Sequence, residues 1–149
     1  MNKITDILNN ISKVFLDTAP LIYYIEGSTN FFSIVDVFFQ GLKSRNIPAI
    51  VSPITLAECL VMPVKLNQAQ IQKNFIDFLT NNREIEMVCI DSEIAVKASE
   101  LRSIYGLKLP DALQIATAIL SQCDAFLTND AGLKRVTELQ ILVVGELRL

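Results

Sequence analysis

The sequence predicts an α/β fold in which a mostly parallel sheet of about five strands is covered by helices on both faces. Short apolar runs rich in β-branched and aromatic residues alternate along the chain with longer segments of helical periodicity. Strands that alternate with helices are joined by crossover connections, which pair the strands in parallel. The runs are also continuously apolar, as is typical of strands covered on both faces.

The expected strands are the short apolar runs at residues 13–17, 49–52, 86–90, 125–128 and 141–145. Before the first strand, apolar side chains recur at helical spacing, at Ile4, Ile7, Leu8 and Ile11. This pattern predicts that residues 1–12 form an amphipathic helix that packs on the domain or on a partner. The chain of 149 residues has the usual size of one domain, so a single domain spanning 1–149 is expected.

Helical segments between the strands carry recognisable start signals. These are Thr18 ahead of Pro20, Ser52 ahead of Pro53, Asn67 ahead of "QAQIQKNFIDFL", and Asp91 ahead of "SEIAVKASELRSIYG", which is expected to stop at Gly106. Further helices are expected over "NFFSIVDVFFQGL" and "LPDALQIATAIL". The former has more large apolar residues than one buried stripe needs, namely Phe31, Phe32, Val35, Phe38 and Phe39. Part of this helix is therefore expected to meet a partner.

The composition favours an oligomeric cytoplasmic protein. Apolar residues make up 51% of the chain, yet no apolar run is long enough to cross a bilayer, and the first residues lack the uninterrupted core of a signal peptide. The surplus apolar surface predicts a homodimer or a complex. Three widely separated cysteines, Cys59, Cys89 and Cys123, lie in apolar surroundings and are expected to be buried side chains in a reducing cytosol.

Charge and the absence of histidine limit the possible chemistry. The formal net charge of -3 argues against a protein that grips nucleic acid with its whole surface, although a local basic rim is compatible with it. With no histidine in the chain, the commonest general base and the Ser/His and Cys/His nucleophile pairs are excluded. Catalysis would have to use carboxylates, hydroxyls, lysines or a hard metal ion.

Four acids are predicted to approach one edge of the sheet, because ligands of open parallel sheets bind beyond the carboxyl ends of the strands. They are Asp17 after the first strand, Glu58 in the second turn of a helix, Asp111 in the first turn of another, and Asp130 after the fourth strand. Each also has an ordinary structural explanation. Asp17 and Asp130 are typical turn residues, Asp111 suits a helix N-terminus, and Glu58 is typical of a solvent-facing position.

Together the acids favour a metal site. Clustered carboxylates raise one another's pKa unless a cation lies between them, and no Lys or Arg is obviously placed to neutralise them. Mg²⁺ or Mn²⁺ is the expected ion, since both accept all-oxygen sites. A metal-activated water then becomes a nucleophile at neutral pH. This hypothesis requires the acids to gather tightly enough to hold a divalent ion.

Four sequence blocks in order resemble those of PIN-domain proteins, particularly the VapC-like toxins of toxin–antitoxin modules. The blocks are "VFLDTAPLIYYIEG", "IVSPITLAECL", "LKLPDALQIATAI" and "AFLTNDAGLKRV", and the resemblance runs from about Val14 to Gly145. It implies a three-layer α/β/α fold with strand order 3-2-1-4-5. It also implies an Mg²⁺- or Mn²⁺-dependent endoribonuclease that has an antitoxin partner. This ribonuclease would cut RNA to leave 5′-phosphate and 3′-hydroxyl ends.

The resemblance also assigns roles to residues. Asp17, Asp111 and Asp130 would hold the metal, with Glu58 as a fourth catalytic acid. Thr128 and Thr18 would support the acidic site. Ala19 is a departure, because many members carry Asn two residues after the first Asp, so a supporting hydrogen bond is expected to be missing.

Other interpretations remain open from the residues. Lys108, Lys134 and Arg135 are candidates for binding the RNA backbone, although ordinary solvated side chains fit them equally well. Tyr23, Tyr24 and Tyr105 are better explained by packing than by base stacking. The main alternative function is a catalytically inactive interaction subunit with the same fold. A phosphotransfer domain ranks lower, because no second acid follows closely after Asp17.

Overall fold

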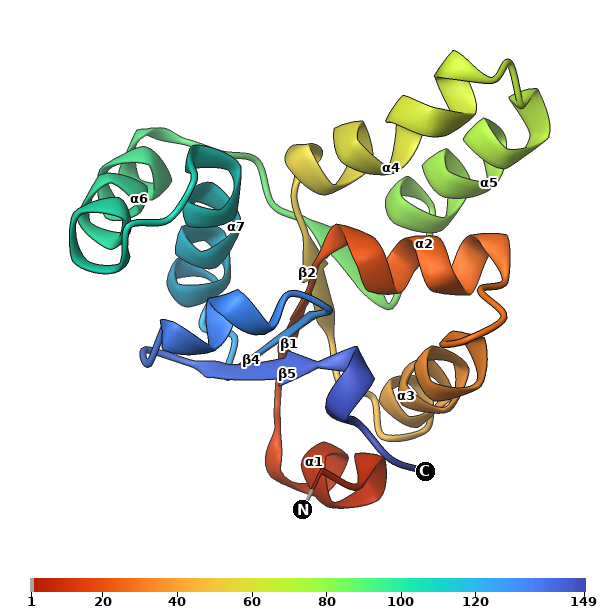
Figure 1. The fold of residues 1–149 in the computed structure, drawn as a ribbon, viewed down its shortest axis with the longest axis horizontal. Coiled ribbons are helices and arrows are strands. Elements are labelled where there is room, and N and C mark those ends of the chain that lie inside the picture. The colour runs from red at the N-terminus through yellow and green to blue at the C-terminus, as the bar shows by residue number, and fades with distance from the viewer. Residues whose placement is uncertain (1) are drawn as a thin grey trace.

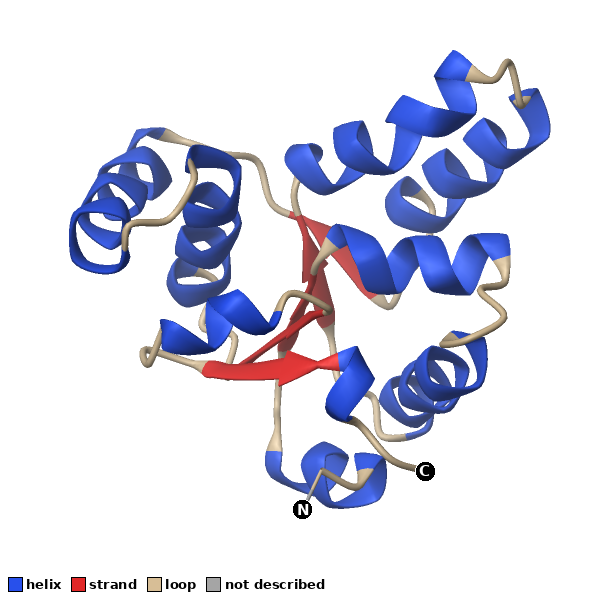
Figure 2. Cartoon of the chain, viewed as in Figure 1, coloured by secondary structure: helices blue, strands red, loops and turns tan. Residues whose placement is uncertain are grey.

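Five parallel strands form one sheet with the order β3-β2-β1-β4-β5 in the computed structural model, which describes residues 2–149 (Figure 1). The order confirms the α/β/α arrangement predicted from the sequence. Two helices separate each strand from the next between β1 and β4, and in Figure 2 the helices surround the sheet. The elements are α1 (Ile4–Asn10), β1 (Val14–Leu16), α2 (Thr18–Glu26), α3 (Phe32–Ser44), β2 (Ala49–Val51), α4 (Pro53–Lys65), α5 (Ala69–Thr80), β3 (Ile85–Met87), α6 (Ser92–Tyr105), α7 (Leu109–Leu120), β4 (Ala125–Thr128), the 3₁₀ helix η1 (Ala131–Arg135), β5 (Gln140–Val143) and the 3₁₀ helix η2 (Val144–Glu146).

Each face of the sheet builds its own core, because successive side chains of a strand point to opposite faces. Val14 and Leu16 of β1 join a cluster with helices α1 to α5, whereas Phe15 joins a second cluster with α6 and α7. Figure 1 shows α6 and α7 on one side of the sheet and α2, α3 and α5 on the other. The central strands are therefore buried on both faces, as the continuously apolar runs predict.

The edge strand β3 differs from its prediction. The run at 86–90 was expected to be covered on both faces, but the strand covers only Ile85–Met87 and Glu86 is exposed. β3 pairs with β2 alone, so it lies at the edge of the sheet and its side chains are only partly covered. The other four strands overlap their predicted ranges, and β4 matches its range from Ala125 to Thr128.

Several predicted helix boundaries are confirmed, and two are wrong. The Ser52 hydroxyl accepts from the Ile54 N–H at 3.1 Å at the start of α4, and Asp91 caps α6 by accepting from the Ile94 N–H at 2.9 Å. Gly106 ends α6 in the left-handed conformation with φ of 65°. The start of α2 differs, because this helix is capped by Asp17 rather than by Thr18. Asn67 also does not start α5, which begins at Ala69. Asn67 itself is left-handed with φ of 54°, a conformation that Asn tolerates in a turn between helices.

The N-terminal helix α1 packs on the domain, as predicted, but it covers only Ile4–Asn10 of the predicted range 1–12, of which residue 1 lies outside the described residues. Its Ile4 and Leu8 side chains are buried, and the Ile4 N–H donates to the Arg148 carbonyl at 2.9 Å. Leu8 lies against Gly41 of α3 so closely that a Cβ at position 41 would overlap with it. The absence of a side chain at this glycine therefore allows α1 to seat on α3. Lys3, just before α1, forms a parallel bridge with Arg148 near the C-terminus.

The distribution of apolar side chains corrects one further expectation, the burial of all three cysteines. Cys59 and Cys123 are buried, but Cys89 is exposed in the segment that leaves the edge strand. In α3, Val35 and Phe38 are fully buried and Phe39 nearly so, leaving Phe32, at 40% exposed, as the accessible large side chain among those singled out. No helix within residues 2–149 is both long and apolar enough to cross a membrane.

Candidate active site

Asp17 lies at the carboxyl end of β1, where it both begins α2 and faces the other candidate acids. Its Oδ1 accepts from the Thr18 N–H at 2.8 Å, so the side chain caps α2. Its Oδ2 accepts from the Thr128 hydroxyl at 2.8 Å. Thus Asp17, rather than Thr18, is the cap residue. The carboxylate is fixed from two directions, by its own helix and by the neighbouring strand β4.

Thr128 connects Asp17 to the loop that carries Asp130. Its hydroxyl accepts from the Asp130 N–H at 3.1 Å while donating to Asp17. Asp130 caps the 3₁₀ helix η1 by accepting from the Gly132 N–H at 2.8 Å, and the residue itself is exposed. The β1 and β4 ends are therefore joined by a continuous set of hydrogen bonds. This is the supporting position that the resemblance implies for Thr128.

Glu58 reaches the same end of the sheet from α4. The Thr18 hydroxyl donates to Glu58 Oε1 at 3.3 Å, so Glu58 lies beside the first residue of α2. Glu58 is otherwise exposed, in agreement with the ordinary solvent-facing explanation, but this contact orients it toward Asp17. Thr18 therefore contacts both acids, donating to Asp17 from its backbone N–H and to Glu58 from its hydroxyl.

Electrostatics place Asp111 with this group. The pKa of Asp17 is raised from 3.8 to about 6, chiefly by burial, with smaller contributions from the charges of Asp111 and Glu58; the hydrogen bonds from Thr128 and Thr18 oppose this rise. Burial and then the charge of Asp130 raise the pKa of Asp111. Each of the four acids therefore interacts electrostatically with at least one of the others: Asp111 and Glu58 raise the pKa of Asp17, and Asp130 raises the pKa of Asp111. The structure thus brings all four predicted acids to one end of the sheet.

The acids are not neutralised by ion pairs. In the described part of the chain, the salt bridges join Lys73 to Asp77, Lys97 to Glu100 and Glu138, and Lys134 to Glu146. None involves Asp17, Glu58, Asp111 or Asp130. Lys108 and Arg135 do lower the pKa of Asp111 through their charges, so the site has positive charge near its rim, which agrees with the local basic rim that the sequence allows.

The donor set suits a hard divalent cation but does not form a closed cage. Across residues 2–149, no three side chains of the metal-binding types lie close enough together to enclose an ion. The tight gathering that the sequence led us to expect is therefore absent. Mg²⁺ does not need such a cage, because it usually binds one or two carboxylates and keeps several waters. The available ligands are carboxylate oxygens, which these ions prefer, and Asp17 is held in place by two hydrogen bonds.

The predicted RNA-binding residues differ in availability. Lys134 is paired with Glu146 at 2.8 Å, and the Arg135 guanidinium donates to the carbonyls of Tyr105 and Gly132. Lys108 is exposed immediately before α7.

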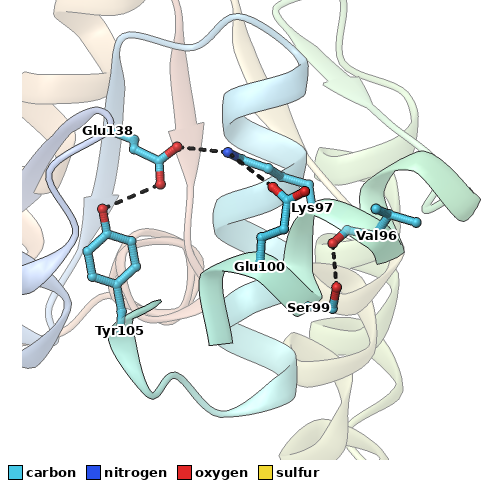
Figure 3. Close-up of polar contacts among 6 residues, drawn as sticks. All are labelled: Val96, Lys97, Ser99, Glu100, Tyr105 and Glu138. Carbon is cyan, nitrogen blue, oxygen red and sulfur yellow. Dashed lines mark hydrogen bonds and ion pairs between the residues drawn. The ribbon is translucent and has the colours of Figure 1, made fainter. Parts of the chain in front are cut away.

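The segment after η1 is also fastened to α6. Glu138 pairs with Lys97 at 2.8 Å and accepts from the Tyr105 hydroxyl at 3.4 Å (Figure 3). Tyr105 therefore serves in packing and in holding this loop. Tyr23 and Tyr24 likewise stack on Phe31 and Phe32.

Two amide side chains had no role assigned from the sequence. Asn129 donates to the Tyr23 hydroxyl at 2.9 Å and accepts from the Gly145 N–H at 2.9 Å, which ties the loop after β4 to α2 and η2. Gln114 is buried in α7 and bonds to Ser52 and Thr55 at the start of α4. The available signal for Gln114 was a single amide in the otherwise apolar stretch "ALQIATAIL".

We predict that Thr128→Val weakens the support of Asp17. The substitution keeps the side-chain shape but removes the hydroxyl that donates to Oδ2, so the pKa of Asp17 should rise beyond about 6. At pH 7 the free energy of unfolding should fall by about 2 kcal/mol, the usual cost of losing a hydrogen bond to a charged group. Carboxyl NMR titration and urea unfolding measure the two effects. Thr128→Ser retains the hydroxyl and is the control; equal Asp17 titration in both variants would contradict the role.

Comparison with known proteins gives a family and a shared fold. A family model described as the PIN domain matches residues 14–139. A search of curated protein sequences returned no match.

Solved structures of low sequence identity share the fold. A chain of a toxin–antitoxin complex from Klebsiella pneumoniae is 24% identical with a TM-score of 0.66, covering 88% of this chain and 97% of that one. A chain of VapBC2 from Rickettsia felis, solved with a promoter DNA fragment, is 21% identical with a TM-score of 0.68, covering 87% and 96%. The Mycobacterium tuberculosis toxin VapC20, described as cleaving the sarcin-ricin loop, is 11% identical with a TM-score of 0.62, covering 76% and 86%.

Proposed function

The chain belongs to the PIN domain family, and from this premise we propose that it is an Mg²⁺- or Mn²⁺-dependent endoribonuclease, the cytoplasmic toxin of a toxin–antitoxin pair. The observation that carries the proposal is the state of the Asp17 carboxylate. Thr18 and Thr128 hold it by hydrogen bonds, and burial and neighbouring acids raise its pKa. Among the described residues, no ion pair neutralises it. Like charges kept together in this way are stabilised by a bound cation.

The residues divide into ligands and supports. Asp17, Asp111 and Asp130 would hold the ion, directly or through its waters, and Glu58 would complete the ligand set or orient a water molecule. When bound, the ion would lower the pKa of water and offset the charge that develops on a phosphoryl group. Thr128 and Thr18 keep Asp17 and Glu58 oriented through the hydrogen bonds described above. No histidine is needed for this chemistry.

RNA would be gripped at the rim of the acidic site. Lys108 is the best-placed of the predicted basic residues, because it is exposed and its charge reaches Asp111. Lys134 would first have to leave Glu146, and Arg135 its backbone acceptors. A protein with net charge -3 and few available cations suits a substrate with splayed, unpaired bases better than a duplex held by many phosphate contacts.

Exposed apolar surface supports the proposed partners, a second copy of the chain and an antitoxin. The C-terminal half of α4 and the residue after it expose Val61, Met62, Val64 and Leu66, each more than half accessible. A separate pocket of about 250 Å³ lies between α2, α3, α5 and the β2–β3 edge and is lined by Tyr24, Phe39 and Phe78, with Lys43 and Glu84 among its polar residues. An amphipathic helix suits such surfaces. The toxin–antitoxin assemblies named for the structural relatives support the same proposal.

An inactive interaction subunit is the second candidate, favoured by the lack of a closed metal cage among residues 2–149. The two functions differ in whether they depend on a divalent metal ion. We expect the purified protein to cut a mixed RNA pool with Mn²⁺ and not with chelator, and Asp111→Asn to cut far more slowly. A cleavage rate that changes neither with chelator nor with the Asp111→Asn substitution would contradict the assignment. A protein that neither cleaves RNA nor gains thermal stability with Mn²⁺ would fit the inactive subunit.

A further inference from the structure

A buried amide bridge joins the two helices that carry Glu58 and Asp111. Gln114 of α7 accepts from the Ser52 hydroxyl through its Oε1, and its Nε2 donates to the Thr55 hydroxyl at 2.8 Å. Thr55 also accepts from the Ser52 N–H at 3.2 Å. All three residues are at most 1% exposed. The bridge is thus a closed set of hydrogen bonds sealed from solvent between α7 and the first turn of α4.

Packing alone does not call for an amide at this position. The other buried positions of α7 are apolar, namely Ala112, Ile115, Ala116 and Ala118, except for Thr117, whose hydroxyl bonds to the Leu113 carbonyl of its own helix. Burying a side-chain amide is unfavourable unless its hydrogen bonds are satisfied, so an apolar residue of the same length would fill the space at lower cost. What the amide adds is geometric. Its donor and its acceptor are satisfied together only when α4 and α7 hold one relative position and rotation.

The relative position of α4 and α7 matters for Glu58 and Asp111, because each of these acids lies one helical turn from the bridge. Asp111 precedes Gln114 by three residues on α7, and Glu58 follows Thr55 by three residues on α4. Residues three apart are neighbours on a helix surface. The helices themselves belong to different layers, since α4 packs chiefly on α5 and α7 chiefly on α6 (Figure 1). The bridge therefore spans the two layers next to the acidic site.

We propose that Gln114 is a positioning residue, whose bridge to Ser52 and Thr55 sets the relative placement of Glu58 and Asp111 for divalent-ion binding. The inference rests on the proposed metal-dependent function. It explains how acids from separate layers keep a shared geometry without forming a closed cage. Each acid sits on a helix whose rotation is fixed by the same amide, so a bound ion would not have to order the two helices itself.

The test compares Gln114→Met with Thr117→Val. The former keeps a long side chain and removes the amide; the latter removes another fully buried hydroxyl of α7, one that bonds to the Leu113 carbonyl of its own helix at 2.7 Å. Two Mn²⁺ titrations are read for each variant: the rise in Tm without RNA, and RNA cleavage. Gln114→Met should raise the Mn²⁺ concentration for half of each effect roughly tenfold, as is usual when a group that orients ligands is lost. Thr117→Val should leave both titrations unchanged.

A second pair of variants protects the test against misfolding. Thr55→Val removes the hydroxyl that Gln114 binds and should behave as Gln114→Met does, whereas Thr55→Ser keeps the hydroxyl and should behave as the unaltered protein does. A folded Gln114→Met or Thr55→Val protein with unaltered Mn²⁺ dependence would overturn the positioning role alone. If the unaltered protein shows no Mn²⁺ effect in either titration, the proposed function fails, and the positioning role with it.

Discussion

Replacing Asp17 by Asn is expected to abolish Mn²⁺-dependent RNA cleavage and, in the absence of metal, to stabilise the protein at neutral pH. The first effect follows from losing a metal-binding carboxylate, which should slow cleavage by roughly 10³-fold, equivalent to several kcal/mol of transition-state stabilisation. The second follows from the cost of holding a charged carboxylate in a partly buried position beside other acids. By contrast, replacing a residue whose role is to stabilise the fold should lower both RNA cleavage and the free energy of unfolding.

The sign of the pH dependence follows from the raised pKa. Asp17 has a pKa of about 6 in the folded protein, against 3.8 for an ordinary aspartate, so between these values the folded state binds more protons than the unfolded state. The stabilising effect of protonated Asp17 is complete below pH 3.8 and is lost as the pH rises through 6. After allowing for partial exposure, the loss at pH 7 amounts to about 2 kcal/mol.

Urea unfolding without metal at a series of pH values between 4 and 7 measures this loss. The unaltered protein should lose stability across the series through Asp17, and Asp17→Asn should remove that part of the change. Asp6→Asn, an equal charge change at an exposed position of α1, is the control and should preserve both the pH dependence and the cleavage. An Asp17→Asn protein that cuts RNA at the normal rate would refute the catalytic assignment, whatever its stability.

Local sequence signals were sufficient to locate four of the five strands and to place Asp17 and Asp130 at the end of the sheet. Asp17 directly follows the buried apolar strand β1, and Asp130 lies two residues after the end of β4. Parallel strands bring such positions to one edge of the sheet. Ser52 and Asp91 begin helices in the structure because a side-chain oxygen satisfies an N–H of the first turn, an interaction within a few residues. The strand order itself came from the resemblance to the PIN family, since local patterns do not specify which strands pair.

Features that depend on distant neighbours were not predictable in the same way. The exposure of Glu86 and Cys89 follows from β3 being an edge strand, a property of the whole sheet. Asn67 was read as a helix cap, although its place between two helices puts it in the left-handed region. The partners of Gln114 lie about sixty residues earlier in the chain, as the 59- and 62-residue separations of the two hydrogen bonds record. The amide was visible in the sequence, but its contacts were not.

Phe126→Ala is expected to cause the largest loss of stability among single substitutions in the second core. The Phe126 and Phe15 rings are stacked with centroids 5.1 Å apart and planes within 2°, and both side chains are fully buried. Truncation removes this stacking and leaves a cavity under α6 and α7, so the free energy of unfolding should fall by about 4 kcal/mol. Phe126→Leu should cost less because it leaves a smaller cavity, and Phe32→Ala, at a 40% exposed position, less again.

The same substitution should reach the acidic site through the strands. Phe15 pairs with Phe126 in the β1–β4 register, and side chains two residues apart on a strand share a face. The Phe15–Phe126 stack therefore lies two residues before the Asp17–Thr128 hydrogen bond, which joins the carboxyl ends of the same two strands. We expect Phe126→Ala to lower the fraction of folded, cleavage-competent protein at 37 °C and Phe126→Leu to retain most of it, with urea unfolding and cleavage measured on the same samples. Loss of cleavage in a Phe126→Ala protein of unchanged stability would show instead that the ring acts on the site directly.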